Sequence, residues 1–311
     1  MTPTLPFIVV EDRQNKTLAA CREAAARAAE PLFVLSQTDA GPAYERFCRT
    51  YVHLSSNTAE FEKICFRRYF LLAQFLESNP QLGAFVLIDS DVLLFEGAGA
   101  HVANLVGKSD FSGSSMQSAD GWNPCQISPH VSYWTANGLR RFVAYVLDCY
   151  ATPSGRRKLR EIAARFASRG VRGGVSDMTL LYLWARTTGN DAPINRVLDG
   201  MVIDHNINGM HNHLPREFLV RGGAKRVAYR DGRAWLTRAS DGARVRVVAL
   251  HFQGSAKMAM PHALRGHMHT VAAVTSALQM ARRARNHVYR AGNFVRRLLD
   301  ARRVPHASAS K

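Results

Sequence analysis

Two acidic residues at the end of an apolar run are the first feature of the sequence that could do chemistry. Residues 84 to 88 have the sequence Ala-Phe-Val-Leu-Ile and are followed by Asp89, Ser90 and Asp91. Such a run is typical of a buried strand, and alternate side chains of a strand share a face, so Asp89 and Asp91 are expected to point together. Two neighbouring carboxylates repel each other unless a cation lies between them. A hard divalent ion prefers such oxygen ligands and keeps coordination positions for a diphosphate.

A second motif follows another apolar segment near the end of the chain. Residues 251 to 257 have the sequence His-Phe-Gln-Gly-Ser-Ala-Lys and come after Val245 to Leu250. The imidazole of His251 could be a third metal ligand, Gly254 lets the backbone approach a phosphate, and Lys257 offers that phosphate a positive charge. Acids that only cap a strand would explain an isolated Asp-x-Asp triplet equally well. The metal hypothesis therefore depends on both motifs together.

A third group of residues, His205, His211 and His213, lies in a segment rich in asparagine and glycine. Three imidazoles can hold a transition metal. The segment has neither the i, i+4 spacing of a helix nor the alternation of a strand, so we expect these to be loop histidines.

The elements that must position these motifs alternate between strand and helix in the first third of the chain, which predicts an α/β fold with a parallel or mixed sheet covered by helices. Residues 109 to 123, rich in Gly, Ser and Asp, are expected to form an ordered loop, and residues 229 to 233 a hairpin turn. Strands are expected at Phe7–Val10, Leu32–Gln37, Tyr51–Leu54, Ala84–Asp89 and Val245–Phe252. Helices are expected at Leu18–Ala29, Ala59–Ser78 (capped by Ser56 or Asn57), Asn137–Cys149, Arg156–Arg169 and Asp177–Arg186 (capped by Ser176).

The composition excludes several classes of protein. A chain of 311 residues with 47% hydrophobic content can bury a large core. Its longest apolar stretch, Ala84 to Phe95, contains two aspartates and is shorter than the roughly 20 residues that a membrane-spanning helix needs. The five cysteines include no Cys-x-x-Cys pair, so neither a disulfide framework nor a thiolate zinc site is expected. Met1 to Glu11 lacks the features of a secretory signal, and we expect a cytoplasmic protein.

The net charge of +17 predicts an anionic partner. Arginines are concentrated between Leu278 and Arg303, where apolar residues recur at helical spacing. Such a helix either lies on the anionic inner surface of a membrane or packs on the domain with its basic side in solvent, and we slightly favour the membrane. No helix-turn-helix, RNA-recognition or zinc-finger signature is present in the sequence, so no specific nucleic acid partner is expected.

The two motifs together resemble those of A-type glycosyltransferases, and especially glycosyltransferase family eight, which includes glycogenin and bacterial galactosyltransferases. The resemblance covers roughly residues 5 to 260. It implies the nucleotide-diphospho-sugar transferase fold, with a mixed, mostly parallel sheet flanked by helices. The catalytic domain would comprise residues 1–260, followed by a basic helical extension over residues 261–304 and a disordered tail over residues 305–311.

The resemblance also implies roles for particular residues. Asp89, Asp91 and His251 would hold Mn²⁺ or Mg²⁺. Asp89 and Ser90 would lie at the nucleotide sugar. Gly254 and Lys257 would contact the phosphates that leave.

Asp177 is similar to a later acid of the family that lies beside the donor sugar and would be the catalytic residue of this set. Two departures bear on this resemblance. The family usually has Asp-Gln where this chain has Asp177 and Met178, and Pro-Trp follows the lysine where this chain has residues 258 to 260, Met-Ala-Met. An acid favoured by the dipole of the first helical turn is the alternative explanation for Asp177.

The implied activity is the transfer of a sugar from a nucleotide-diphosphate donor, expected to be a UDP-sugar, to a hydroxyl of a saccharide acceptor such as a surface glycan or lipid-linked saccharide. The resemblance implies a retaining reaction. Two alternatives stay open. Asp89 could be the nucleophile of a phosphohydrolase, because it too would follow a buried strand. A basic protein that binds membrane or nucleic acid without catalysis is the other.

Overall fold

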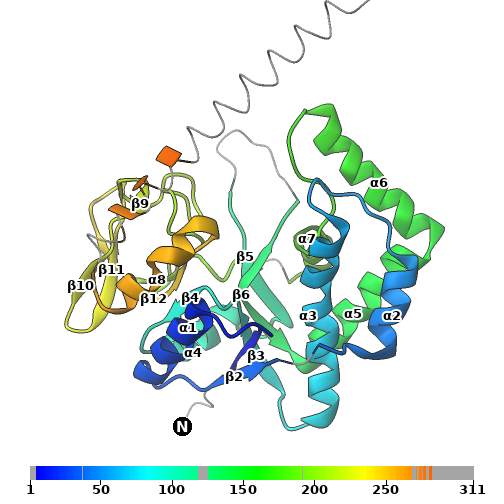
Figure 1. Cartoon of the computed structure of the whole chain (residues 1–311), viewed down its shortest axis with the longest axis horizontal. Coiled ribbons are helices and arrows are strands. Elements are labelled where there is room, and N and C mark those ends of the chain that lie inside the picture. The colour runs from blue at the N-terminus through cyan, green and yellow to red at the C-terminus, as the bar shows by residue number, and fades with distance from the viewer. Residues whose placement is uncertain are drawn as a thin grey trace, which may run out of the picture.

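The centre of the protein is a five-stranded mixed sheet (Figure 1). A computed structural model describes residues 5–36, 38–117, 125–190 and 192–267 and a few positions between 271 and 281. The strands are β1 (Phe7–Val10), β2 (Leu32–Leu35), β3 (Ala84–Ile88), β5 (Phe111–Ser114) and β6 (Ser128–Thr135). Their order is β2-β1-β3-β6-β5. The first three are parallel, whereas β6 is antiparallel to both of its neighbours.

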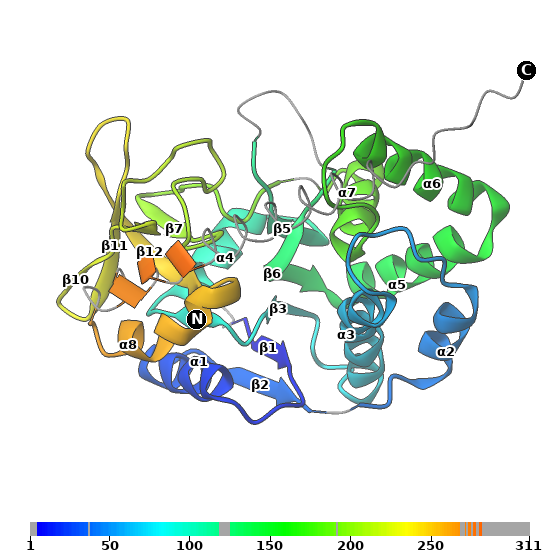
Figure 2. The ribbon, with the colours of Figure 1, turned by 45° about the horizontal axis from the view of Figure 1, so that its top comes forward.

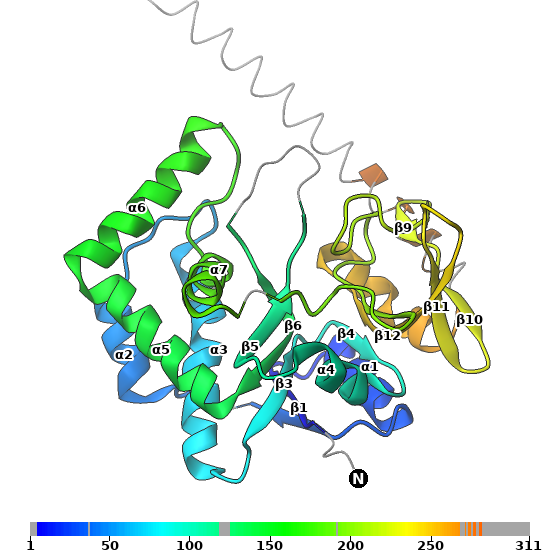
Figure 3. The same ribbon diagram turned by 180° about the vertical axis from the view of Figure 1, so that it is seen from behind.

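Alternate residues of the central sheet enter two different cores, which explains why these strands are apolar on both faces. Phe7 and Val86 belong to one core, and Ile8 and Phe85 to the other. Figures 1 and 3 show one group of helices gathered on one side of the sheet and a second group, with a smaller sheet, on the other. The first group is α2 (Gly41–Thr50), α3 (Ala59–Ser78), α5 (Ala136–Ala151), α6 (Pro153–Ser168) and α7 (Asp177–Thr188). The second is α1 (Lys16–Arg27), α4 (Ala98–Val106) and α8 (Met260–Leu264).

A second sheet packs beside the first, and the short strand β4 follows directly from β3 of the first sheet. The strands of the second sheet are β4 (Val92–Leu94), β7 (Met201–Ile203), β10 (Ala228–Arg230), β11 (Arg233–Thr237) and β12 (Arg244–His251). β4 follows β3 after a three-residue turn and pairs with the end of β12, so it belongs to the second sheet. Strands β8 (Val220–Arg221) and β9 (Ala224–Lys225) form a small hairpin that pairs with neither sheet. Helix α8 packs beside α1, as Figure 2 shows.

Several predictions from the sequence are confirmed with their bounds. β1 and α3 begin and end at the predicted residues. The predicted hairpin turn joins β10 to β11, with Asp231 and Gly232 both at positive φ (52° and 71°). Ser176 is the N-cap residue of α7, which starts at Asp177, and its amide donates to Thr179 Oγ1 at 3.2 Å.

The prediction of a mostly parallel sheet is wrong. Three strand pairings are parallel and six are antiparallel among the described residues. The reason is that several connections, such as those between β10, β11 and β12, are short hairpins, and a short connection can only join antiparallel strands.

Three local predictions are also wrong. Tyr51–Leu54 is not a strand, because Tyr51 packs among aromatic rings and not beside a second strand. Part of the predicted loop 109–123 is the buried strand β5, in which a side chain at Gly113 would collide with Ile127. Thr58 caps α3, since Asn57 is instead hydrogen-bonded to Glu62.

The C-terminal helix predicted over Leu278–Arg303, together with most of the extension 261–304 and the tail 305–311, lies outside the described residues and stays a prediction. None of the helices in the described part of the chain is long and apolar enough to cross a membrane.

A buried histidine in α4 makes stability depend on pH. His101 is 1% exposed, and its Nε2 has no hydrogen-bond partner among the described residues. Burial lowers the pKa of His101 from 6.5 to about 4; Arg246 adds to this effect and Asp199 opposes it. The unfolded chain therefore binds a proton near pH 6.5, whereas the folded protein does so only near pH 4. Stability from this group is present above pH 6.5 and is lost as the pH falls towards 4.

We expect His101→Leu to remove this part of the pH dependence. Between pH 7.5 and pH 5 the parent should lose about 2 kcal/mol more free energy of unfolding than the variant. Urea unfolding at the two pH values measures both losses. Parallel losses in parent and variant would show that His101 is not the group responsible.

Candidate functional site

The pairing of β4 with β12 brings the two sequence motifs together. Val92 and His251 are opposite each other in this antiparallel pair, and the amide of Phe252 donates to the carbonyl of Asp91 at 2.9 Å. The imidazole at the end of β12 therefore lies beside the acid that precedes β4. One oxygen or nitrogen each from Asp89, Asp91 and His251 lies within 4.8 Å of the others. The structure thus brings together the three residues that the sequence predicts as metal ligands.

The two acids meet through a turn and not through strand alternation. β3 ends before Asp89, and the amide of Val92 donates to the carbonyl of Asp89 at 3.2 Å. Ser90 points elsewhere, since its hydroxyl donates to Glu11 Oε2 at 2.9 Å. The sequence argument about a shared strand face is therefore wrong in its reason, although the two carboxylates do converge.

The hydrogen bonds of His251 fit a role as a metal ligand. Its Nδ1 donates to the carbonyl of His205 at 2.6 Å, which in the neutral ring leaves the lone pair on Nε2. That Nε2 lies 3.5 Å from Asp91 Oδ1, a buried oxygen that accepts no hydrogen bond from any described residue. A lone pair and a buried carboxylate oxygen facing each other need a positive charge between them. The donor set therefore fits a divalent cation.

The same pair can share a proton when no metal is bound. Burial alone would lower the pKa of His251, but the adjacent Asp91 carboxylate outweighs it and raises that pKa. Burial tends to raise the pKa of Asp91, and the combined effect of His251 and Lys257 lowers it. His205, on the other side, is neutral because burial lowers its pKa to about 3.

Two side-chain cations stand beside the acids. Lys257 Nζ lies 2.9 Å from Asp91 Oδ2, and Arg68 donates to Asp89 Oδ1 at 2.7 Å. The Lys257 side chain is 46% exposed, so it can leave Asp91 for a phosphate at little cost.

Gly254 begins the 3-10 helix η1 (Gly254–Ala259) with φ +63°, and no described atom lies within 4 Å of where its Cβ would be. The backbone conformation therefore requires glycine, and contact with a phosphate stays a prediction.

Asp177 lies next to this cluster but is not part of it. At the start of α7 it is 3% exposed and accepts hydrogen bonds from the Tyr69 hydroxyl at 3.0 Å and from the Met178 amide at 2.9 Å. Its carboxylate lies 3.9 Å from Arg68. Burial raises the pKa of Asp177 overall, although Arg68 and Tyr69 oppose that rise.

Arg68 is the residue of this site that the sequence analysis missed. It links Asp89, in the turn after β3, to Asp177 in α7. The available signal was its place on α3, three residues after Cys65 and four before Leu72, which puts a cation on the inward side of an amphipathic helix.

A cavity of about 590 Å³ opens over the acids at the carboxyl ends of β1 and β3, where open α/β sheets bind their ligands. Its lining carries both acidic and basic side chains. Some of these follow β1 and were not predicted from the sequence as site residues. The charged lining residues are Glu11, Asp12, Arg13, Arg67, Arg68, Asp89, Asp91 and Lys257.

Comparison with known proteins gives only distant likenesses. No family model and no curated protein matches the chain. Among solved structures it is similar to the galactosyltransferase LgtC bound to donor and acceptor sugar analogs (10% identity, TM-score 0.41, covering 88% of this chain and 96% of LgtC). It is also similar to mouse xyloside xylosyltransferase 1 (10% identity, TM-score 0.39, covering 61% of this chain and 85% of that protein). A third similar structure is a glycosyltransferase involved in glycosylation of the major capsid of PBCV-1 (14% identity, TM-score 0.31, covering 49% of this chain and 69% of that protein).

These three neighbours are glycosyltransferases, the class that the sequence motifs resemble.

We expect Arg68→Met to destabilise the protein by about 2 kcal/mol, because it leaves the buried Asp177 carboxylate without its neighbouring cation. Arg67→Met is the matched control on the same helix. Arg67 pairs at 3.3 Å with Asp12, which is partly exposed, and its loss should cost less than about 1 kcal/mol. Urea unfolding measures both. Equal, small losses of unfolding free energy in the two variants would contradict the linking role of Arg68. In a double variant, Asp177→Asn added to Arg68→Met should restore part of the stability that Arg68→Met loses.

Proposed function

We propose that the protein is a metal-dependent glycosyltransferase that uses a nucleotide-diphosphate sugar, and that its fold is of the A type. The observation that supports this most directly is the convergence of His251 and Lys257 on Asp91. A metal ligand and a phosphate-binding cation from one segment meet an acid from another, beside a charged cavity large enough for a nucleotide.

Asp89, Asp91 and His251 would hold the ion. Mn²⁺ suits a set of two carboxylates and an imidazole, and Mg²⁺ is the alternative. When bound, the ion would neutralise charge on the diphosphate as it leaves. The unpaired Asp91 Oδ1 and the Nε2 lone pair of His251 support this assignment.

The chain's own side chains would assist the leaving group and orient the sugar. In the reaction, the bond from the anomeric carbon to the phosphate oxygen breaks, and its electron pair stays on the diphosphate. The acceptor oxygen bonds to that carbon, and the hydroxyl proton passes to the base formed on the leaving phosphate. Lys257 would turn from Asp91 to this phosphate, where its charge stabilises the developing anion. Arg68, between Asp89 and Asp177, would orient the sugar, and Asp177 would act through Arg68.

The two alternative functions explain less of the site. A phosphohydrolase would use Asp89 as nucleophile, but Oδ1 of Asp89 is hydrogen-bonded to Arg68, and such a reaction assigns no role to His251 or Lys257. A binding protein without catalysis leaves the unpaired, buried Asp91 Oδ1 without a purpose. Retention of configuration, a UDP donor, a cytoplasmic location and membrane contact through the C-terminal arginines remain predictions of the sequence.

The proposal is tested by thermal unfolding with UDP and Mn²⁺. UDP near 100 times its Kd should raise the Tm of the parent by about 3–6 °C when Mn²⁺ is present, and by much less with UDP and a chelator. Asp91→Ala and His251→Ala should each abolish the Mn²⁺-dependent part of the rise, because each removes one ligand.

Glu77→Ala is the control, since it removes an exposed acid on α3 far from the cavity lining. It should respond like the parent. Stabilisation of the parent by UDP that is equal with and without metal would overturn the metal site. Release of inorganic phosphate from phosphate esters without turnover of any sugar nucleotide would favour the phosphohydrolase.

Lys257→Met should weaken UDP binding roughly 10- to 100-fold, because a charge-assisted contact to phosphate is lost. Binding of Mn²⁺ alone should be kept, since Lys257 is not a metal ligand. Isothermal titration calorimetry measures the two affinities separately. Lys158→Met, an exposed lysine on α6, is the control. Unchanged UDP affinity in Lys257→Met would remove Lys257 from the phosphate site.

A further inference from the structure

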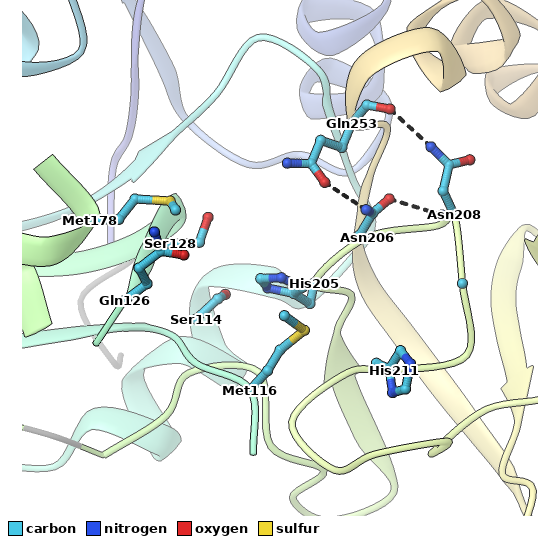
Figure 4. Close-up of a pocket in the computed structure, with 11 residues that line it drawn as sticks. Ser114, Met116, Gln126, Ser128, Met178, His205, Asn206, Asn208, His211 and Gln253 are labelled. Carbon is cyan, nitrogen blue, oxygen red and sulfur yellow. Dashed lines mark hydrogen bonds between the residues drawn. The ribbon is translucent and has the colours of Figure 1, made fainter. Parts of the chain in front are cut away.

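A second cavity, of about 300 Å³, has His205, a hydrogen-bond partner of His251, in its wall; Figure 4 shows the residues that line it. It shares none of its lining residues with the charged cavity. Residues from five parts of the chain form its wall. They are Ser114 at the end of β5 and Met116 after it, Gln126 before β6 and Ser128 at its start, Met178 in α7, then His205, Asn206, Asn208, Gly209 and His211 after β7, and Gln253 after β12.

The wall of this pocket touches the proposed metal ligand directly. The carbonyl of His205 accepts the hydrogen bond from His251 Nδ1. The ring of His130 is stacked on that of His251, with centroids 4.1 Å apart and planes 11° apart, and Ser128 is hydrogen-bonded to His130 at 2.9 Å. The pocket is thus connected to His251 directly through His205, and through His130 by way of Ser128.

Among the residues that the structure describes, the lining of the pocket carries no acidic or basic side chain other than histidine. Its eleven residues are Ser, Met, Gln, His, Asn and Gly, with no carboxylate, ammonium or guanidinium group among them. In a chain with a net charge of +17, and next to a cavity with eight charged lining residues, this is a sharp local contrast. An ionised ligand group placed here would lose its hydration and gain no counter-charge from the wall, which is costly.

Hydrogen bonds fix which polar groups remain for a ligand. Gln253 Oε1 accepts from Asn206 Nδ2 at 2.6 Å, so the Gln253 amide nitrogen is left as a donor, and Figure 4 shows it on the side away from Asn206. His130 Nε2 lies 3.1 Å from the carbonyl of Asp204 and must donate to it, so Nδ1 accepts the proton of Ser128. The Ser128 oxygen therefore keeps lone pairs that can accept a hydrogen bond from a ligand.

Two further atoms of the wall lack partners. His205 Nδ1 and Asn208 Oδ1 are buried and form no hydrogen bond with any described residue, which costs about 1–3 kcal/mol for each such group. Met116, drawn near His205 in Figure 4, and Met178, drawn near Ser128, add adaptable apolar surface. Donors, acceptors and an apolar face around a small volume are what a sugar ring, with hydroxyls at its edge and C–H groups on its faces, requires.

We propose that this pocket binds the acceptor, and that the acceptor residue held there is an uncharged saccharide whose hydroxyls contact Ser128 and Gln253. This inference rests on the function proposed above and makes it more specific: phosphorylated, sialylated or uronic-acid residues are excluded from this position.

The test measures saccharide binding by saturation-transfer NMR in the presence of UDP and Mn²⁺. The probes are neutral disaccharides (lactose, maltose, cellobiose) and matched acidic ones that carry a uronic acid. At least one neutral probe should bind, and its acidic counterpart should bind at least 10-fold more weakly. Ser128→Ala should weaken the neutral probe roughly tenfold. Gln126→Lys should shift the preference towards the acidic probe, a change that loss of structure could not produce.

Gln81→Ala, an exposed glutamine outside the lining, is the matched control and should bind both probes like the parent. The inference fails if UDP still stabilises the parent with Mn²⁺ while acidic probes bind as well as neutral ones, or while no neutral probe binds. It also fails if Ser128→Ala and Gln126→Lys change nothing. The absence of any metal-dependent effect of UDP would instead count against the proposed function, so the two failures can be distinguished.

Discussion

The register between β4 and β12 is the constraint on which the rest of the site depends. Val92 lies opposite His251, and the hydrogen bond from the amide of Phe252 to the carbonyl of Asp91 extends this pairing by one residue. Side chains alternate between the faces of a strand, so a slip of one residue would turn the imidazole of His251 away from the acids. The apolar residues of β4 and β12 hold the register because they are buried in the same core. The hydrophobic packing of one short strand therefore sets the geometry of the proposed metal site.

A buried ion pair holds the loop that carries His205 in place. Lys225, in the small hairpin, contacts the carboxylate of Asp204, and both side chains are fully buried. Lys225 also donates to the carbonyl of Asn206 at 2.8 Å, and Asp204 accepts weakly from the amide of His251 at 3.4 Å. The loop that carries His205 is thus tied to β12 on one side and to the hairpin on the other. Removing one partner of such a pair leaves an uncompensated charge in the core, which usually costs about 3–5 kcal/mol. This rigidity keeps the carbonyl of His205 where it orients His251.

The sequence predicted which side chains lie together better than it predicted the sheet. Asp89, Asp91 and His251 could be grouped because each lies at or just after the end of an apolar strand, and the ends of strands are where side chains reach a ligand. Their roles as metal ligands stay predictions. The same reasoning missed Arg68, since its role comes from packing α3 against the turn after β3, a contact between segments that no local pattern reveals. It also missed β6 and the Ser128–His130 pair for the same reason. The mostly parallel sheet was wrong because apolar runs show that a strand is buried and not which way its neighbour runs.

The two cavities give the proposed reaction a direction. One is lined by charges of both signs and suits a diphosphate with its ion; the described lining of the other has no carboxylate, ammonium or guanidinium group and suits hydroxyls. His251 contacts one lining residue of each cavity, since its Nε2 lies 3.5 Å from Asp91 and its Nδ1 donates to the carbonyl of His205. Charge develops on the leaving phosphate during transfer, so the cations belong on that side, and a charge-free wall on the other side avoids competing for the same phosphate. The separation of charge across one imidazole is consistent with a donor that lies with its phosphates over Asp91 and its sugar towards His205.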